Sequence, residues 1–138
     1  MALIQGLISL LLEQTSITSV VAGGTAVQTI PAPTETSGYP AVVIHQVSET
    51  NEYTLNGNVG MTHARICLDC LAPQNPGGYG IARNLAIAVK KTLDGFIGNL
   101  PDGTHVWFSE VVSVSDSFDA DATISCTTVQ ALITFNEQ

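Results

Sequence analysis

The sequence predicts an α+β fold: an antiparallel or mixed sheet of four or five strands, with helices packed mainly on one face. Residues 80–96, GIARNLAIAVKKTLDGF, repeat apolar side chains every three or four positions, which indicates an amphipathic helix. Four other segments are either rich in β-branched residues or alternate between apolar and polar side chains, and turns that contain glycine, proline or asparagine separate them: 41–48, 61–71, 105–115 and 124–135. Because strands and helices come in separate runs, a sheet covered by helices on one side is the simplest arrangement.

The length and composition fit a single domain spanning residues 1–138. Hydrophobic residues make up 45% of the chain and charged residues 12%, which indicates a compact core rather than disorder. Four Lys and Arg against twelve Asp and Glu give a net charge of -8, and this balance argues against a protein that grips nucleic acid. The odd number of cysteines, three, favours a reducing compartment over a secreted disulfide framework.

The chain opens with an apolar helix in residues 1–14, MALIQGLISLLLEQ. Gln5, Ser9 and Glu13 form a narrow polar line, so we expect the helix to be buried on its other sides. A secretory signal is the alternative, but no Lys or Arg precedes the apolar run and Glu13 follows it directly. The run is also shorter than the ~20 residues that a membrane span requires, and we predict no membrane partner.

The next segment is expected to be short and irregular. Thr15 or Ser16 is expected to cap a single helical turn, and residues 26–30 are expected to form a short strand. Three prolines within residues 31–40 then keep the chain out of a sheet ladder. The sequence leaves open whether the Tyr39–Pro40 bond is cis.

Residues 41–48 and 61–71 are expected to pair as an antiparallel hairpin. Alternate residues of the second strand separate into an apolar and a polar side: Ala64, Ile66, Leu68 and Cys70 against His63, Arg65, Cys67 and Asp69. The connection carries Asn56 and Gly57, a strong turn dipeptide. Its length predicts either a protruding hairpin tip or a loop that becomes ordered against a partner.

The predicted helix of residues 80–96 concentrates the positive charge, because Arg83, Lys90 and Lys91 project from one side of it. Gly95 is expected to follow its last turn. Ile87 lies among the polar positions, either as a single exposed apolar residue or as a contact to another subunit. The opposite, buried side is expected to consist of six residues: Ile81, Leu85, Ala88, Val89, Leu93 and Phe96.

Two further strands are expected after this helix. In residues 105–115 one apolar side is interrupted by Glu110 and comprises four residues: Val106, Phe108, Val112 and Val114. In residues 124–135 the inward residues are Val129, Ala131, Ile133 and Phe135.

A short acidic connection is expected between these two strands, with Asp116, Asp119 and Asp121 in it. Calcium binding is the alternative interpretation, but the glycine and the closing glutamate of an EF-hand loop are missing. A solvated acidic loop is therefore the prediction.

Cys67 and Cys70 form a C-x-x-C motif, which elsewhere binds zinc or cycles between thiol and disulfide. In an extended strand residues i and i+3 point to opposite faces, so we expect the two sulfur atoms to diverge and Cys70 to be a core residue. A metal site drawn from His63, Cys67 and Asp69, with His45 or His105 nearby, is a second alternative, although histidines on sheets are more often half-buried polar residues. We find no nucleophile elbow and no phosphate-binding loop, and predict no cofactor, metal site or catalytic residue.

Taken together, the layout resembles the small neck proteins of long-tailed bacteriophages that are called tail-completion, tail-to-head joining or tail-terminator proteins. The resemblance covers nearly the whole chain and consists of weakly specific motifs in order: ITSVVAGG after the first helix, IPAP at residues 30–33, YPAVVI at 39–44, ARICLDC, YGIARNLAIAVKKTLDGF and two closing strands. The long tip at residues 51–60 and the two cysteines are departures from that pattern.

The resemblance implies a non-enzymatic virion protein that assembles in the host cytoplasm. Such proteins form a ring, commonly of six subunits, which caps the tail tube, stops its growth and offers a surface for head attachment. The implied partners are other copies of the chain, the tail tube protein and the connector or neck proteins of the head, with DNA passing nearby without specific binding.

Charge suggests how such a ring could work. Acidic residues facing the lumen would repel DNA rather than hold it; the candidates are Glu49, Glu52, Asp116, Asp119 and Asp121. The candidates for contacts with a subunit or partner are Arg83, Ile87, Lys90, Lys91, Asn56 and Gly57, and the basic residues among them could meet the acidic edge of the next subunit. Two other classes stay open: a small cytoplasmic binding domain, and a thiol or zinc protein that uses Cys67 and Cys70.

Overall fold

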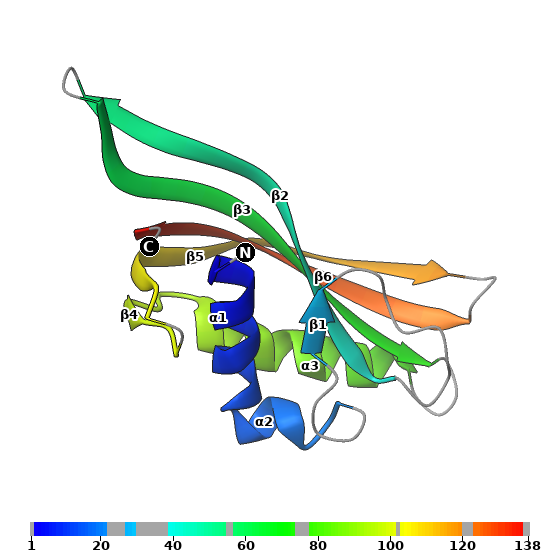
Figure 1. Ribbon diagram of the computed structural model, residues 1–138. Helices are drawn as coiled ribbons and strands as arrows, with labels where there is room; N and C mark the ends of the chain where they lie inside the picture. Colours follow the sequence, from blue (N-terminus) through cyan, green and yellow to red (C-terminus); the bar gives the residue numbers. More distant parts are fainter. Residues whose placement is uncertain are drawn as a thin grey trace.

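A computed structural model describes residues 2–21, 27–29, 39–54, 57–73, 78–101, 103–119 and 123–136. The elements follow one another as α1 (Ala2–Leu12), α2 (Thr15–Thr18), β1 (Val27–Thr29), β2 (Ala41–Thr54), β3 (Gly57–Pro73), α3 (Gly78–Leu93), β4 (Gly98–Asn99), β5 (His105–Asp119) and β6 (Ile124–Asn136). The strands form one curved, twisted layer and the helices form a second layer beneath it (Figure 1). The predicted α+β class is confirmed.

The sheet has six strands among the described residues, in the order β1-β2-β3-β6-β5-β4. β1 runs parallel to β2, whereas all other neighbours are antiparallel, so the sheet is mixed. The predicted number of four or five strands is wrong. The additional strand is β4, in a segment expected to be only a turn, where Gly98 and Asn99 pair with Val106 and His105.

The helices cover one face of the sheet, as predicted (Figure 1). Leu7 and Leu11 of α1 and Leu85 and Val89 of α3 are buried in one apolar cluster with side chains of the sheet. The strand residues of that cluster include Val42, Ile44, Ile66, Leu68, Ile133 and Phe135. None of the helices in the described ranges has both the length and the apolar character that a membrane crossing needs.

The narrow polar line predicted for α1 is confirmed, because Gln5, Ser9 and Glu13 are exposed while the leucines around them are buried. The predicted cap of α2 is wrong: Gln14 precedes the first turn, and no side chain caps it. The Tyr39–Pro40 peptide bond, which the sequence left undecided, is cis.

β3 and β6 alternate as the sequence predicts. Ala64, Ile66 and Leu68 of β3 are buried under the helices, and they pair in register with Ile133, Ala131 and Val129 of β6. Residues opposite one another in an antiparallel pair point to the same side of the sheet. His63, Arg65 and their neighbours therefore lie on the face without helices, which we call the open face.

β5 does not follow its predicted alternation, because two irregularities in its pairing with β6 shift the register, between Val106 and Phe108 and between Val111 and Ser113. An extra residue in one strand reverses the side to which the following residues point. Val106 is buried as predicted, but Phe108 and Val112 are exposed. Ser109 takes a buried position in register with Ile133.

β2 and β3 form the predicted hairpin, which is longer than the sequence indicated. The β3–β6 ladder stops at Met61, while β2 and β3 continue to pair as far as Thr54 and Gly57. The two strands therefore project beyond the body of the molecule (Figure 1). We call this projecting part of the β2–β3 hairpin, residues 51–54 and 57–60, the hairpin arm. Of the two predicted alternatives, a protruding hairpin and a loop that becomes ordered against a partner, the structure has the hairpin.

α3 begins at Gly78 and ends at Leu93, two residues before Gly95. Gly78 lies so close to β3 that an added Cβ would be 2.2 Å from the carbonyl oxygen of Pro73, and Gly95 adopts a φ of 77° after the last turn, as expected. The buried side is rotated slightly from the predicted one. Ala82 and Ala86 are buried, whereas Ile81 and Ala88 are only half-buried.

Candidate assembly surfaces

The side of α3 that faces away from the sheet carries the basic residues expected there. Burial of Leu85 and Val89 turns five residues outward, which we call the α3 outer surface: Arg83, Asn84, Ile87, Lys90 and Lys91. Ile87 is 46% exposed, an unusual position for a large apolar side chain among charges. The two interpretations of Ile87 from its helical position were a single exposed apolar residue and a contact to another subunit, and both require this exposure.

Ile87 stands between two shallow hollows. One, of about 380 Å³, lies between α3 and the segment around α2 and is lined by Gln14, Ser16, Val20, Asn84, Ile87, Ala88, Lys91 and Thr92. The other, of about 150 Å³, lies between α3 and β5 and is lined by Arg83, Ala86, Ile87, Lys90 and Val114. The two neighbouring lysines therefore belong to different hollows, Lys91 to the first and Lys90 to the second.

Arg83 makes its contacts within its own chain. Its Nη1 lies 3.4 Å from Oδ1 of Asp116. Thr127 Oγ1 donates a hydrogen bond to the same oxygen at 2.8 Å, and the Tyr79 hydroxyl donates to Oδ2 at 3.4 Å. The prediction that Asp116 lies in the connection between strands is wrong, because it is a β5 residue in register with Thr127.

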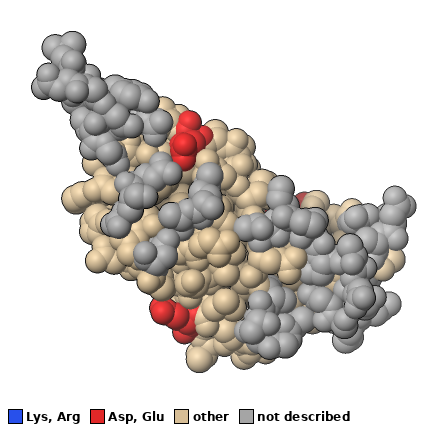
Figure 2. Space-filling model, in the orientation of Figure 1, with Lys and Arg blue, Asp and Glu red and all other residues tan. Residues whose placement is uncertain are grey.

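Lys90 and Lys91 differ from Arg83, since the ammonium group of neither has an ion-pair or hydrogen-bond partner among the described residues. Both are exposed near the C-terminal end of α3, where a cation complements the helix dipole. Figure 2 shows acidic side chains and no described Lys or Arg on the face that it presents. The described part of that face therefore carries negative charge alone, and the two lysines lie elsewhere on the surface.

The other predicted acidic and turn residues are spread over several places. Glu49 is exposed on β2, and Asp119 is paired in register with Ile124 at the end of β5. Gly57 begins β3, where it pairs with Thr54. Asn56 and Asp121 lie outside the described residues, and Glu52 is described only through its backbone in β2. The structure does not bring the predicted acidic residues together in one cluster.

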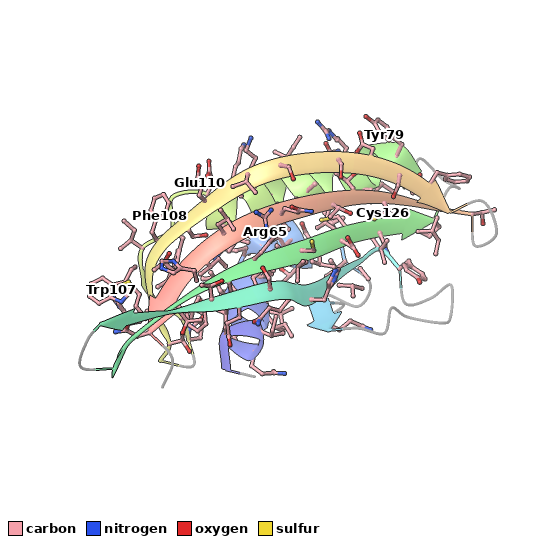
Figure 3. All side chains as sticks on the ribbon, turned by 90° about the horizontal axis from the view of Figure 1, so that it is seen from above. Arg65, Tyr79, Trp107, Phe108, Glu110 and Cys126 are labelled. Carbon is pink, nitrogen blue, oxygen red and sulfur yellow. The ribbon has the colours of Figure 1, made fainter. Side chains whose placement is uncertain are left out.

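The β5 strand carries apolar exposure that the sequence interpretation missed. Trp107, Phe108, Val112 and Phe118 are 47%, 48%, 40% and 52% exposed, respectively. Trp107 and Phe108 lie near one end of the sheet, followed by Glu110 along β5, and Tyr79 of α3 lies near the other end (Figure 3). Regular alternation along the strand predicted that Phe108 and Val112 lie in the core. The two register shifts in β5 make that prediction wrong, and no signal in the sequence revealed them.

The open face of the sheet is polar at its centre. Arg65 Nη1 donates to Gln130 Oε1 at 3.0 Å, and Thr128 Oγ1 donates to Asp69 Oδ1 at 2.7 Å. Nδ1 of His63 is 2.9 Å from Oγ1 of Thr134. Arg65 and Cys126 are seen on this face in Figure 3. The side chains bind one another across β3 and β6, an arrangement that stabilises the sheet.

The cysteines have the geometry expected for structural residues. Cys70 belongs to the core cluster under the helices, whereas Cys67 lies outside it and pairs in register with His45 on the other face. Burial raises the pKa of both thiols, and in the half-buried Cys126 burial is again the main cause of a raised pKa. The thiolate, which binds metals and reacts, is therefore disfavoured at all three. Within the described ranges no group of three His, Cys, Asp or Glu is placed to hold a metal ion.

Comparison with known families decides what kind of protein this is. The family model described as "Tail completion protein gp17" matches residues 5–135, nearly the whole chain. The chain belongs to the tail completion protein gp17 family. It is accordingly a structural protein of bacteriophage tails, as the sequence resemblance implied.

The fold of this tail completion protein recurs in a solved structure. A chain from the structure titled "Virion of native gene transfer agent (GTA) particle" matches with a TM-score of 0.76 at 14% sequence identity, covering 98% of this chain and 95% of that one. At such low identity the match shows a shared fold. No curated protein sequence matches this chain significantly.

Proposed function

We propose that this tail completion protein forms a ring, with six subunits as the expected number, at the head-proximal end of a phage tail, where it ends growth of the tail tube and joins tail to head. The observation that carries the proposal is the family match over residues 5–135. The occurrence of the same fold, at nearly equal length, in a chain of a virion supports a place in the particle.

The surfaces support assembly rather than catalysis. Ile87 and the two free lysines form an outward surface that nothing in the described chain covers, and β5 exposes a row of large apolar residues. Exposed apolar patches of this kind mark sites of protein association. The partners we propose are other copies of the chain, the tail tube protein and the connector or neck proteins.

The charge of the chain suits a ring through which DNA passes. A net charge of -8 gives the subunit an overall repulsion toward phosphates, so DNA would slide past without being held. Glu52, Asp119 and Asp121 are the candidates for the lumen, whereas Asp116 is engaged by Arg83 and Thr127.

Deletion of the gene tests the proposal. We expect particles from the deletion lysate, viewed by electron microscopy, to have tails of abnormal length or tails lying free beside full heads. Overlong tails would assign the role of ending tube growth, and free tails of normal length would assign the role of joining. Intact infectious virions of ordinary appearance would contradict the proposal.

A further inference from the structure

The sheet ends in two free edges in the part of the chain that the structure describes. β1 pairs only with Val42–Ile44, so β2 has no strand beside it on that side from His45 to Thr54. At the other edge, β4 pairs only with His105 and Val106 of β5.

The connection after α3 covers the next part of β5. The Gly95 amide donates to the Ser109 carbonyl at 2.8 Å, and the Val111 amide donates to Oδ1 of Asp94 at 3.1 Å. From Val112 to Asp119 no described segment covers the outer side of β5. We call residues 112–119 the β5 free edge and residues 45–54 the β2 free edge.

Apolar side chains gather at these edges. Val112 and Phe118 are exposed on the β5 free edge, Trp107 and Phe108 precede it, and Val47 is exposed on the β2 free edge. Three of the nine large apolar residues that are exposed in the described chain therefore lie on the two free edges, and two more lie earlier in β5. Soluble proteins protect the edges of their sheets with charges, short strands or covering segments, because an uncovered edge pairs with other strands. A long edge with exposed Val and Phe therefore indicates a strand-pairing partner.

We propose that the β5 free edge binds the β2 free edge of a second copy of this chain, an inference that rests on the proposed ring. In the order β2-β3-β6-β5 each strand is antiparallel to the next, so β2 and β5 of one sheet run in opposite directions. A second sheet placed beside the first in the same orientation therefore brings its β2 antiparallel to this β5. The contact joins two different edges, and repeated contacts of this type form a ring when the rotation from one copy to the next closes, as the proposed function requires.

Charge complementarity supports this partner. Glu49 is in register with Ala64, whose side chain is buried under the helices, so Glu49 lies on the helix side of β2. On a strand added outside β5, the helix side faces the hollow that Lys90 and Val114 line. The added strand would thus bring a carboxylate without a described partner to an ammonium group without one, and Lys91, in the other hollow, would remain outside this contact.

Cross-linking of particles tests the contact with native residues. Lys90 and Lys91 are the only lysines of the chain, so a carbodiimide, which joins an amine to a carboxylate in direct contact, gives few products. After treatment of purified particles, we expect a dimer band of this protein in which mass spectrometry finds the Lys90 and Glu49 peptides joined. A Lys90→Arg variant keeps the charge but should lose the cross-link.

Charge reversal provides the second measurement. Lys90→Glu and Glu49→Lys should each reduce incorporation into particles roughly tenfold, and the double variant should recover most of the loss, as for contacting pairs in double-mutant cycles. Lys91→Glu is the matched control: because Lys91 lies in the other hollow, Glu49→Lys should not recover any loss of incorporation that Lys91→Glu causes. Unchanged thermal unfolding would show that the variants fold.

The outcomes separate the two proposals. Particles that contain the protein but give neither the cross-link nor the recovery would overturn the edge contact and leave the proposed function standing. Particles that form normally without the protein would overturn both.

Discussion

At the scale of single residues, Asp116 shows how a side chain can link elements that are far apart in sequence. Its carboxylate accepts hydrogen bonds from Thr127 on β6 and Tyr79 on α3, and it pairs with Arg83. Thr127 is fully buried, so its hydroxyl is shielded from water and depends on this partner. An acidic residue that appears in the sequence to belong to a solvated loop thus holds α3 to the edge of the sheet.

The cysteines give a prediction that depends on pH. Burial raises the pKa of Cys70 above its ordinary value of 9.0, so above pH 9 the unfolded chain loses a proton that the folded chain keeps. The free energy of unfolding should therefore be unaffected by this group below pH 9 and should fall as pH rises above 9, with a slope approaching about 1.4 kcal/mol per pH unit. Urea denaturation from pH 7 to 11 measures it.

A Cys70→Ala variant is the comparison that isolates this group, because burial also raises the pKa of the other two cysteines. We expect its stability to be lower at pH 7 but to fall less steeply above pH 9. In the native protein, iodoacetamide should modify the half-buried Cys126 before the fully buried Cys70. Equal slopes for the two proteins, or early modification of Cys70, would contradict this account.

Residue spacing predicted some faces correctly and others not. The alternation of Ala64, Ile66 and Leu68 matches the burial in β3, because this strand pairs with β6 without interruption. In β5 the same reasoning placed Phe108 and Val112 inward, and both are exposed. The cause is the pair of register shifts, which depend on how β5 meets β6 and leave no periodic signal in the strand itself.

At the scale of elements, substitution by alanine should have opposite effects on stability at two glycines near the start of α3. A Cβ at Gly78 would collide with the backbone of Pro73, whereas a Cβ at Gly80 would have no neighbour within 4 Å. Gly78→Ala should therefore lower the free energy of unfolding by roughly 1–3 kcal/mol, as overpacking does. Gly80→Ala should raise it by about 0.5–1 kcal/mol, because alanine favours the helix.

Urea denaturation of the two variants checks this pair. Both substitutions add one methyl group to the same turn of helix, so each serves as the control for the other. Similar effects of the two variants would mean that α3 does not begin as closely against β3 as the structure has it. The sequence identified this helix and its end at Gly95, but the close approach at Gly78 arises from tertiary packing.

The β2–β3 hairpin was predicted correctly in kind, but its first strand was predicted too short. The sequence identified both strands and a turn dipeptide at Asn56 and Gly57, but it ended the first strand at Ser48. In the structure β2 continues to Thr54, through two register shifts in its pairing with β3. The segment NEYT contains Asn and Glu, which are depleted in strands, and pairing with β3 overrides that preference.

At the scale of the whole molecule, the described chain leaves surfaces uncovered that a neighbouring subunit could cover. The helices bury one face of the sheet, the polar network of Arg65, Asp69 and their partners occupies the open face, and two sheet edges remain uncovered among the described residues. Fold class and family could be inferred from the sequence, because they depend on the order of elements. The assembly surfaces could be inferred only in part: Ile87, Lys90 and Lys91 were found by helical spacing, whereas the β5 edge required the observed pairing.

Location of the protein in the particle tests the central claim most directly. A cryo-electron microscopy reconstruction of purified particles should show this fold as a closed ring between the head and the last ring of the tail tube. We expect six copies, with the sheets arranged edge to edge around the channel. The same fold distributed along the tube, or particles from which the protein is absent, would contradict the claim that it completes the tail.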